Sequence, residues 1–251
     1  MKWDRYILPL ALILVWEGLS LIRVIPSHLL PSPINILLGL RDLMVIGMPP
    51  GYLLPYHALH SLYRVALGFA FAALLGIPLG LLMGGSPRLR RIVNPVIEVI
   101  RPIPPLAWIP IAILWFGIGM KSAAFIIFLG AFFPILLNTV SGVVSINPIY
   151  FEAARTLNAK PKHIFFKVLL PGATPSIFVG MRIGVGIGWM TLVAAEFTGV
   201  KSGYGLGYMI MTARDIQRPD EILAGMLIIG LIGVLINGVL RAYESRVVRW
   251  Q

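Results

Sequence analysis

The residues best able to make specific polar contacts gather in one segment, Phe151–Pro171, which interrupts an otherwise very apolar chain. The single acid and the four basic residues of this segment are Glu152, Arg155, Lys160, Lys162 and Lys167. Because four positive charges are costly to place in hydrocarbon, the segment belongs in water or at a membrane surface. Ion pairing and hydrogen bonding to another macromolecule are the chemistry that these residue types offer.

No catalytic or metal-binding pattern accompanies this segment. The chain has no cysteine, which excludes disulfides, thiolate metal sites and cysteine nucleophiles. It has four histidines, which show no metal-ligand spacing: His28, His57, His60 and His163. No Gly-x4-Gly-Lys-Ser/Thr loop is present to hold nucleotide phosphates, and Val200–Gly203 has similar letters in the wrong order. We therefore expect no catalytic residue, no metal and no cofactor in this chain.

The polar segment has the local signals of two short helices joined by a turn. The first helix is predicted over Ile149–Leu157, and Asn158 follows it as a residue that tolerates the left-handed conformation. Pro161 fits the first turn of a second helix, where its missing N–H costs nothing, and we expect Pro171 to end that helix. Such a helix–turn–helix could dock into a groove of a soluble partner; the alternative is an ordinary basic loop.

Composition places the rest of the chain in a bilayer. The 251 residues are 58% hydrophobic and 12% charged, whereas a typical soluble domain carries about 25% charged residues. Apolar runs predict an all-α membrane protein, a single domain over residues 1–251, with six transmembrane helices at about 6–22, 59–83, 103–119, 122–144, 177–197 and 222–240. The net charge of +11 is scattered between these runs, so it points to anionic lipid rather than nucleic acid.

The N-terminal apolar run resembles a signal peptide. No small-residue cleavage site follows it, and Glu17 interrupts its core, so we predict an uncleaved first span. Glu17 is expected to face protein or water, or to reach the membrane interface. After an extended segment, Ser32-Pro33 begins a helix over Ile34–Val45 that is too short to span and is predicted to lie along the membrane surface.

Prolines break the third predicted span. Four of them forbid a regular helix across Arg101–Pro110: Pro102, Pro104, Pro105 and Pro110. Irregular backbone at membrane depth occurs only where it is buried in protein or lines a cavity. Trp108 of this segment could therefore line a translocation path; the alternative is an aromatic anchor at the membrane interface.

Small residues recur every four positions in two other spans. Gly76, Gly80 and Gly84 lie on one face of the second span, and the fifth span has a similar face of Gly180, Gly184 and Gly188. Such faces predict close packing between helices.

The distribution of basic residues predicts the orientation. With both termini inside, most of the 21 Lys and Arg residues lie on cytoplasmic segments, among them Lys2, Arg88, Arg101 and Arg249, as the positive-inside rule requires. The basic residues assigned to the outer side are Arg23, Arg41, Arg64, Lys121, Lys201, Arg214 and Arg218. Arg64, near the start of the second span, is expected to extend to the membrane surface. This orientation places Phe151–Pro171 in the cytoplasm.

Two stretches carry a resemblance to a known family. Glu152-Ala153-Ala154, a turn residue six positions after the glutamate, and then Leu170-Pro171 resemble the EAA loop of binding-protein-dependent ABC importer permeases. The family usually has glycine at the turn, where this chain has Asn158. The sequence of Arg101–Pro110, followed by that of Trp115–Gly119, resembles the taurine, sulfonate, nitrate and bicarbonate branch of that family.

This resemblance implies a type I ABC importer permease (MetI-like) architecture, in which residues 149–171 form a coupling loop that inserts into a cytoplasmic ATPase. It implies these ATPase-coupling residues: Glu152, Ala153, Ala154, Arg155, Asn158 and Pro171. The implied partners are a second permease copy, two cytoplasmic ATPase subunits that bind ATP and Mg, an extracytoplasmic solute-binding protein and membrane lipid. The implied location is the inner membrane, with no nucleic acid bound.

The implied solute is a small anion such as taurine or an alkanesulfonate, or nitrate or bicarbonate. The candidate residues of its path are Trp108, Arg182, Trp189 and Glu196; Arg182 has the alternative of pairing with lipid phosphate or a cytoplasmic carboxylate. Two other classes remain: an ATP-independent secondary transporter or channel, disfavoured by the thin pattern of buried acids and histidines, and an intramembrane enzyme, disfavoured by the lack of a nucleophile–base pair. The sequence does not select the solute.

Overall fold

The computed structural model describes residues 4–22, 24–48, 51–199 and 203–248, and the regular secondary structure within these ranges is helical. The chain divides into two compact units, one of residues 1–62 and 200–232 and the other of residues 63–199 and 233–251. Four basic residues used above to predict the orientation lie outside the described residues: Lys2, Arg23, Lys201 and Arg249. Residues 200–202, which were compared with a phosphate-binding loop, also lie outside them.

The first unit holds helices from both ends of the chain. It contains α1 (Asp4–Leu21), α2 (Pro33–Val45), the first turns of α3 (Leu54–Gly85), α10 (Leu206–Asp215) and the first half of α11 (Pro219–Val247). Its buried apolar residues come chiefly from α2 and α10 and include Ile36, Leu43, Leu206, Met209 and Ile210. By contrast, most apolar side chains of α1 are exposed.

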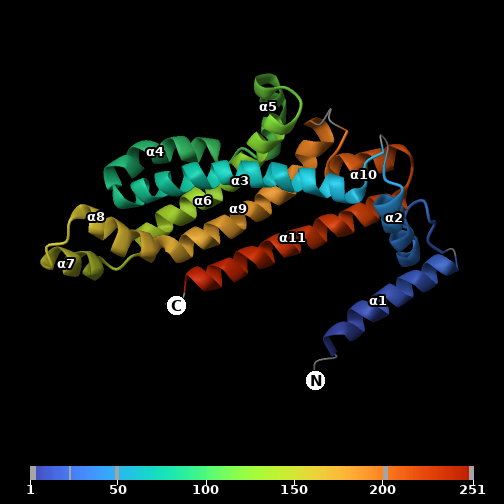
Figure 1. Ribbon diagram of the computed structural model, residues 1–251, viewed down its shortest axis with the longest axis horizontal. Coiled ribbons are helices and arrows are strands. Elements are labelled where there is room, and N and C mark those ends of the chain that lie inside the picture. Colours follow the sequence, from blue (N-terminus) through green and yellow to red (C-terminus); the bar gives the residue numbers. More distant parts are fainter. Residues whose placement is uncertain (1–3, 23, 49–50, 200–202, 249–251) are drawn as a thin grey trace. The chain divides into compact units, whose positions relative to one another are not determined.

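The second unit holds the longest helices (Figure 1). Beside the remainders of α3 and α11 it contains α4 (Pro87–Ile100), the 3-10 helix η1 (Pro105–Trp108), α5 (Ile109–Phe116), α6 (Met120–Val144), α7 (Pro148–Thr156), α8 (Pro161–Ile164), the π-helix η2 (Phe165–Leu169) and α9 (Leu170–Gly199). Figure 1 shows α7 and α8 at one end of this unit, beyond the ends of α3 and α4.

A capping serine or asparagine followed by proline begins three of these helices. Ser32 Oγ accepts the amide of Asn35 at the start of α2 (3.2 Å), and Ser86 Oγ accepts that of Leu89 at the start of α4 (3.3 Å). The side chain of Asn147 does the same at the start of α7. A polar N-cap satisfies an N–H that the helix leaves unpaired, and the proline that follows has none to satisfy. The predicted helix over residues 34–45 is thereby confirmed.

The described residues contain four or five candidate membrane-spanning segments. Four helical segments are long and apolar enough to cross a membrane: α3, α6, Pro161–Phe197 and α11. A fifth is reached if α4 and Pro105–Phe116, which meet at 82°, count as one broken span. The remaining apolar helix, Ile7–Leu21 of α1, is shorter. The all-α class is confirmed, and the helix is interrupted at the prolines after Ile100 as expected. The third span itself, the count of six spans and the single domain over 1–251 stay predictions.

Glycine faces set the distance between the long helices of the second unit, as the sequence predicts. A Cβ added at Gly80 of α3 would lie 2.6 Å from Thr139 Cβ of α6, and one at Gly84 would lie 2.5 Å from Val143 Cβ. On α9, a Cβ at Gly184 would lie 2.9 Å from the Ala131 carbonyl oxygen of α6. These distances are shorter than van der Waals contact, so only glycine fits where α3 and α9 pack against α6.

The prediction that Pro171 ends a helix is wrong. The helical path continues from Pro161 through η2 and α9 to Phe197, with Pro171 in the first turn of α9. The amide of Leu170 bonds to the carbonyl of Phe165, five residues back. This wider π-turn directly before the proline accommodates a residue that lacks an N–H and that would clash with the carbonyl four residues earlier in a regular α-helix.

We predict that Gly80→Ala lowers the free energy of unfolding by about 1–3 kcal/mol, because the new methyl group overpacks the contact with Thr139. Gly186→Ala on α9 is the matched control, since a Cβ there meets nothing within 4 Å and alanine favours the helix. Thermal unfolding in detergent measures both. Equal melting temperatures for the two variants would contradict the close approach of α3 and α6.

Candidate functional site

The segment predicted to dock onto a partner forms a helical hairpin, defined here as residues 147–164. Asn147 Oδ1 accepts the amide of Ile149 (3.0 Å) at the start of α7. After α7, Asn158 adopts a left-handed conformation with φ 52°, and the amide of Ala159 bonds to the carbonyl of Ala154 (3.0 Å). Asparagine replaces glycine here because it is among the few residues that enter this region. The predicted helix–turn–helix and its turn are confirmed.

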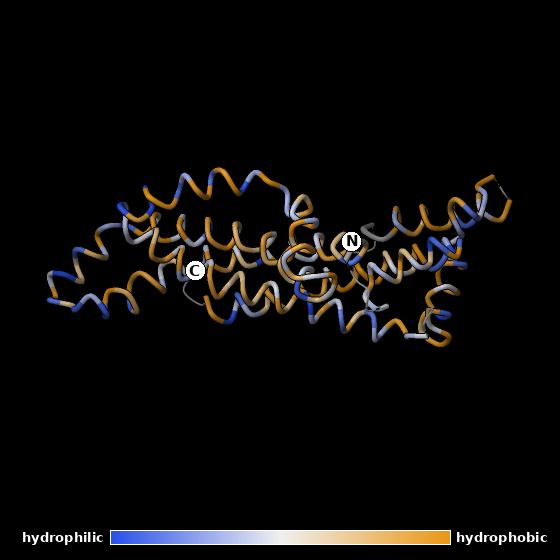
Figure 2. Tube along the Cα trace, turned by 90° about the horizontal axis from the view of Figure 1, so that it is seen from above, coloured by the Kyte–Doolittle hydropathy of each residue, from blue (hydrophilic) through white to orange (hydrophobic). Residues whose placement is uncertain are grey.

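Most residues of the hairpin are exposed, and neither α7 nor α8 contains a buried residue. Glu152, Ala153 and Arg155 are exposed. Figure 2 shows many hydrophilic residues at the end of the second unit where the hairpin lies, and mostly hydrophobic residues along the long helices next to it. Large apolar side chains are nevertheless exposed on it: Ile149 by 59%, Tyr150 by 62% and Leu157 by 83%. Exposed apolar side chains among charged ones are typical of a protein-binding surface.

The hairpin is joined firmly to the helices of the second unit. Phe165 and Leu169 of η2 pack against a buried cluster that includes Leu81 of α3 and Val143 of α6. On the entry side, Ile146 packs so closely on α9 that a Cβ added at Gly172 would lie 2.9 Å from its Cδ1. Both ends of the hairpin are therefore held by side chains that pack against α6 and α9.

The four residues predicted to line a solute path are not brought together. Trp108 lines a cavity of about 430 Å³ in the second unit, between η1, α6 and α9. Arg182, Trp189 and Glu196 do not line this cavity. Trp189 is buried, and its indole lies against Gly233 of α11. Sequence reasoning missed Arg101 and Asn138, which line the cavity with Trp108.

Arg64 and Glu196 form a buried ion pair between α3 and α9. Their side chains are 1% and 0% exposed, so the expectation that Arg64 extends to the membrane surface is wrong. Since a buried charge is costly unless it is paired, each residue accounts for the other. The sequence shows a cation in one long apolar run and an anion in another. It does not show that the two side chains meet, because that depends on the register between the packed helices.

Arg182 of α9 pairs with Glu244 of α11, with 3.0 Å between Nη1 and Oε2. A role in the solute path, lipid phosphate and a cytoplasmic carboxylate were the alternatives for Arg182. In the structure it pairs with a carboxylate of the same chain. Both side chains are only partly buried, so this pair contributes at most about 1 kcal/mol.

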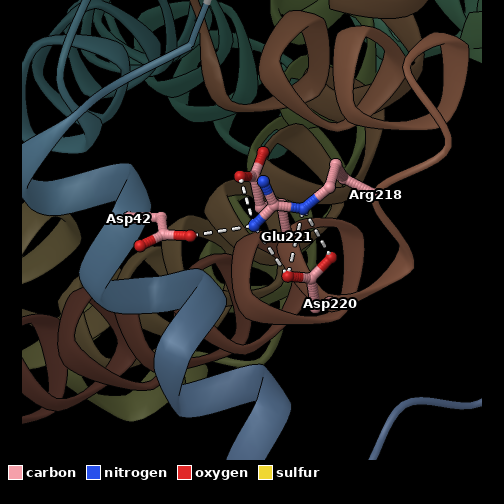
Figure 3. Close-up of polar contacts among 4 residues, drawn as sticks. All are labelled: Asp42, Arg218, Asp220 and Glu221. Carbon is pink, nitrogen blue, oxygen red and sulfur yellow. Dashed lines mark hydrogen bonds and ion pairs between the residues drawn. The ribbon is translucent and has the colours of Figure 1, made fainter. Parts of the chain in front are cut away.

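Arg218 joins three carboxylates in the first unit (Figure 3). Its Nη2 atom lies 2.9 Å from Asp42 of α2, 2.8 Å from Asp220 and 3.0 Å from Glu221 of α11. The hydrogen bond to Asp220 raises the pKa of Arg218 above its ordinary value, so the guanidinium remains charged. No set of three or more His, Asp or Glu side chains within the described ranges is arranged to hold a metal ion. The Arg218 cluster instead joins α2 to the start of α11 by ion pairs.

Three further polar contacts stabilise helix starts in the first unit. Glu17 Oε2 accepts the amide of Ile34 at the start of α2 (3.2 Å), so Glu17 faces protein, one of the environments expected for it. Ser61 Oγ accepts the amide of Leu206 (2.9 Å) at the start of α10. His57 Nδ1 lies 3.0 Å from the amide nitrogen of Gly205. His57 is thus a capping residue for α10, four residues from Ser61 on the same face of α3.

Comparison with known proteins identifies the architecture. The family described as "Binding-protein-dependent transport system inner membrane component" matches residues 76–249. The taurine transport system permease protein TauC of Escherichia coli (strain K12) is 39% identical over 242 residues, covering 95% of this chain and 86% of TauC. An ABC transporter permease protein of Methanocaldococcus jannaschii is 44% identical over 173 residues, covering 69% of this chain. The match spans only 64% of that archaeal relative.

Among solved structures, an inward-facing conformation of the MetNI methionine ABC transporter superposes with a TM-score of 0.61. It is 23% identical and covers 77% of this chain and 93% of the other. At this identity the likeness concerns the fold alone, and it confirms the expected MetI-like architecture.

We predict that removing either member of the buried ion pair is costlier than removing both. Arg64→Met or Glu196→Leu alone leaves an uncompensated buried charge and should destabilise the protein by about 3–5 kcal/mol. The double variant should recover most of that loss. A double-mutant cycle of thermal unfolding in detergent measures the coupling, and additive losses would contradict a direct pair.

The left-handed turn of the hairpin predicts opposite effects for two substitutions of Asn158. Asn158→Gly should preserve the turn, because glycine enters this region without a steric cost. Asn158→Val should disfavour it by about 1–2 kcal/mol. Amide hydrogen exchange of α7 and α8 measures the change, and faster exchange in the glycine variant than in the valine variant would exclude the turn described here.

Proposed function

Because the chain belongs to the family of binding-protein-dependent transport system inner membrane components, we propose that it couples a separate cytoplasmic ATPase to the import of a small anionic solute. In this proposal the chain is a multi-pass permease subunit of an ABC importer that binds no nucleotide itself. ATP and Mg belong to the ATPase subunits. An extracytoplasmic binding protein delivers the solute.

The observation that carries this proposal is the exposed hairpin of residues 147–164. It combines basic residues with exposed Ile149, Tyr150 and Leu157, which suits insertion into a groove that has both apolar and acidic lining. Glu152 and Arg155 are proposed to make polar contacts with the ATPase, whereas Ala153 and Ala154 permit close approach. Asn158 sets the turn, and Pro171 lies where the hairpin continues into α9.

The coupling follows from how the hairpin is held. Closing of the ATPase dimer around ATP moves the groove, and the hairpin moves with it as a rigid lever. Its packing through Phe165 and Leu169 passes the movement to α3, α6 and α9. These helices then change from inward-open to outward-open, and hydrolysis of ATP reverses the change.

The assembly that we propose contains two copies of this chain, related by a two-fold axis, and two ATPase subunits. The chain lies in the inner membrane among lipids, with the hairpin and both termini in the cytoplasm. The solute is of the taurine and alkanesulfonate kind or the nitrate and bicarbonate kind; similarity to TauC over nearly the whole chain supports the former. Arg182, Trp189 and Glu196, which pair or pack within the protein, are proposed to support the path rather than to contact solute.

The double substitution Glu152→Lys with Ala153→Asp tests this proposal. It reverses a charge and places a carboxylate where close approach is needed, so recovery of the ATPase with the permease should fall about tenfold or more. Solute uptake should fall in parallel. The measurement is the ATPase recovered per permease after affinity purification of the complex.

Asp215→Lys on α10 is the matched control, because Asp215 is exposed, lies outside the hairpin and undergoes the same reversal of charge. It should leave ATPase recovery unchanged. Normal recovery and normal uptake in the hairpin variant would refute the coupling role.

A further inference from the structure

We propose that the cavity beside Trp108 binds an organic anion that has a short apolar tail, with Arg101 as its principal charge partner. The binding follows from the cavity itself. Its interpretation as a solute site within the membrane rests on the proposed function.

The cavity lies where the regular backbone of the second unit is interrupted. It is lined by the proline-rich break after α4, by residues 129–138 in the middle of α6, and by Ile183 and Ile187 in the middle of α9. Arg101 therefore lies beside the middle of two long apolar helices, which differs from its assignment to the cytoplasmic charges. Broken helices at this depth place polar backbone and side chains beside a transported solute in membrane transporters.

The polar groups that line the cavity are mainly donors. Within the described part of the chain, no ion-pair or hydrogen-bond partner occupies the Arg101 guanidinium or the Trp108 indole N–H. Asn138 donates one amide N–H to the Pro134 carbonyl (2.8 Å), and an asparagine amide has a second. A guanidinium offers a fork of donors that matches the oxygens of a carboxylate, sulfonate or phosphate group.

The charge of the cavity has one sign. Among the described residues, Arg101 is the only charged one that lines the cavity, and none of the lining residues is Asp or Glu. A cation would meet Arg101 without a counter-charge, whereas an anion would be attracted. These groups therefore favour an anionic head.

The remaining lining accommodates an apolar tail. It is formed by aliphatic and aromatic side chains, among them Leu129, Phe133, Leu137, Ile183 and Ile187. The volume of about 430 Å³ lies within the range of about 300–1,000 Å³ for small-molecule sites, which combine apolar walls with a few polar groups. An anionic head on a tail of a few carbons matches both parts of the lining.

This chemistry has two possible sources, a water-soluble organic anion and the head of an acidic lipid. The test uses the full-length chain in nanodiscs of phosphatidylcholine, with 1-butanesulfonate as the probe and tryptophan fluorescence as the signal. Trp108→Phe identifies the part of the signal that arises in the cavity. 1-Butylammonium is the probe of opposite charge, and a second set of nanodiscs contains phosphatidylglycerol.

We expect saturable binding of 1-butanesulfonate and none of 1-butylammonium. Arg101→Gln should weaken the apparent affinity about tenfold or more, because it removes a charge-assisted contact. Asn138→Asp, which is isosteric but places a carboxylate in the cavity, should weaken it similarly. Arg91→Gln is the matched control, because Arg91 is an exposed arginine of α4 that does not line the cavity. The apparent affinity of this variant for 1-butanesulfonate should stay within about twofold of that of the unmodified chain.

The proposal is overturned if the unmodified chain gives no saturable response, if Arg101→Gln binds as tightly as the unmodified chain, or if 1-butylammonium binds equally well. Loss of 1-butanesulfonate binding in phosphatidylglycerol nanodiscs would assign the site to acidic lipid and overturn the solute assignment. Thermal unfolding of each variant separates lost binding from lost folding. Since these assays need no ATPase, their failure is distinct from failure of the hairpin to retain the ATPase.

Discussion

Satisfaction of backbone polar groups in hydrocarbon is the constraint on which the structure depends. An unpaired N–H or C=O there costs several kcal/mol, so long helices are the only regular solution for an all-α chain. The four long segments, α3, α6, Pro161–Phe197 and α11, follow from it. So does the π-turn before Pro171, which lets one helical path run from the hairpin into α9. That continuity is the structural basis for the proposal that the hairpin acts as a lever.

The same constraint gives the broken segment its importance. Prolines between α4 and α5 prevent a regular helix, and the two parts meet at 82°. The irregular backbone is accommodated beside the middle of α6 and α9, where a cavity of about 430 Å³ lies. The hairpin is joined to α6 and α9, and the same two helices line the cavity. Close glycine contacts, such as that of Gly184 with Ala131, fix the separation of these helices. Under the proposed function, a movement of the hairpin reaches the cavity through close-packed helices rather than through flexible loops.

Charged side chains are paired within the packed helices of the second unit but exposed on the hairpin. Inside the second unit, Arg64 and Glu196 neutralise each other between α3 and α9. On the hairpin, basic residues stay exposed among exposed apolar side chains. The first pattern ties two helices in register, since a shift would separate buried charges, and the second leaves the hairpin free to bind a partner. Arg101 is exposed like the basic residues of the hairpin, but it lines a cavity whose lining, among the described residues, contains no acid.

Local sequence determined the capped helix starts, the left-handed Asn158, the proline break after α4 and the glycine faces. These features are local because caps, prolines and four-residue repeats act within one or two helical turns. Only the tertiary structure decided which distant side chains meet. Arg64 with Glu196, Arg182 with Glu244, and Asp42 with Arg218 are separated by 132, 62 and 176 positions. No local signal specifies such pairs, since the register between packed helices is set by side-chain fit over their whole contact.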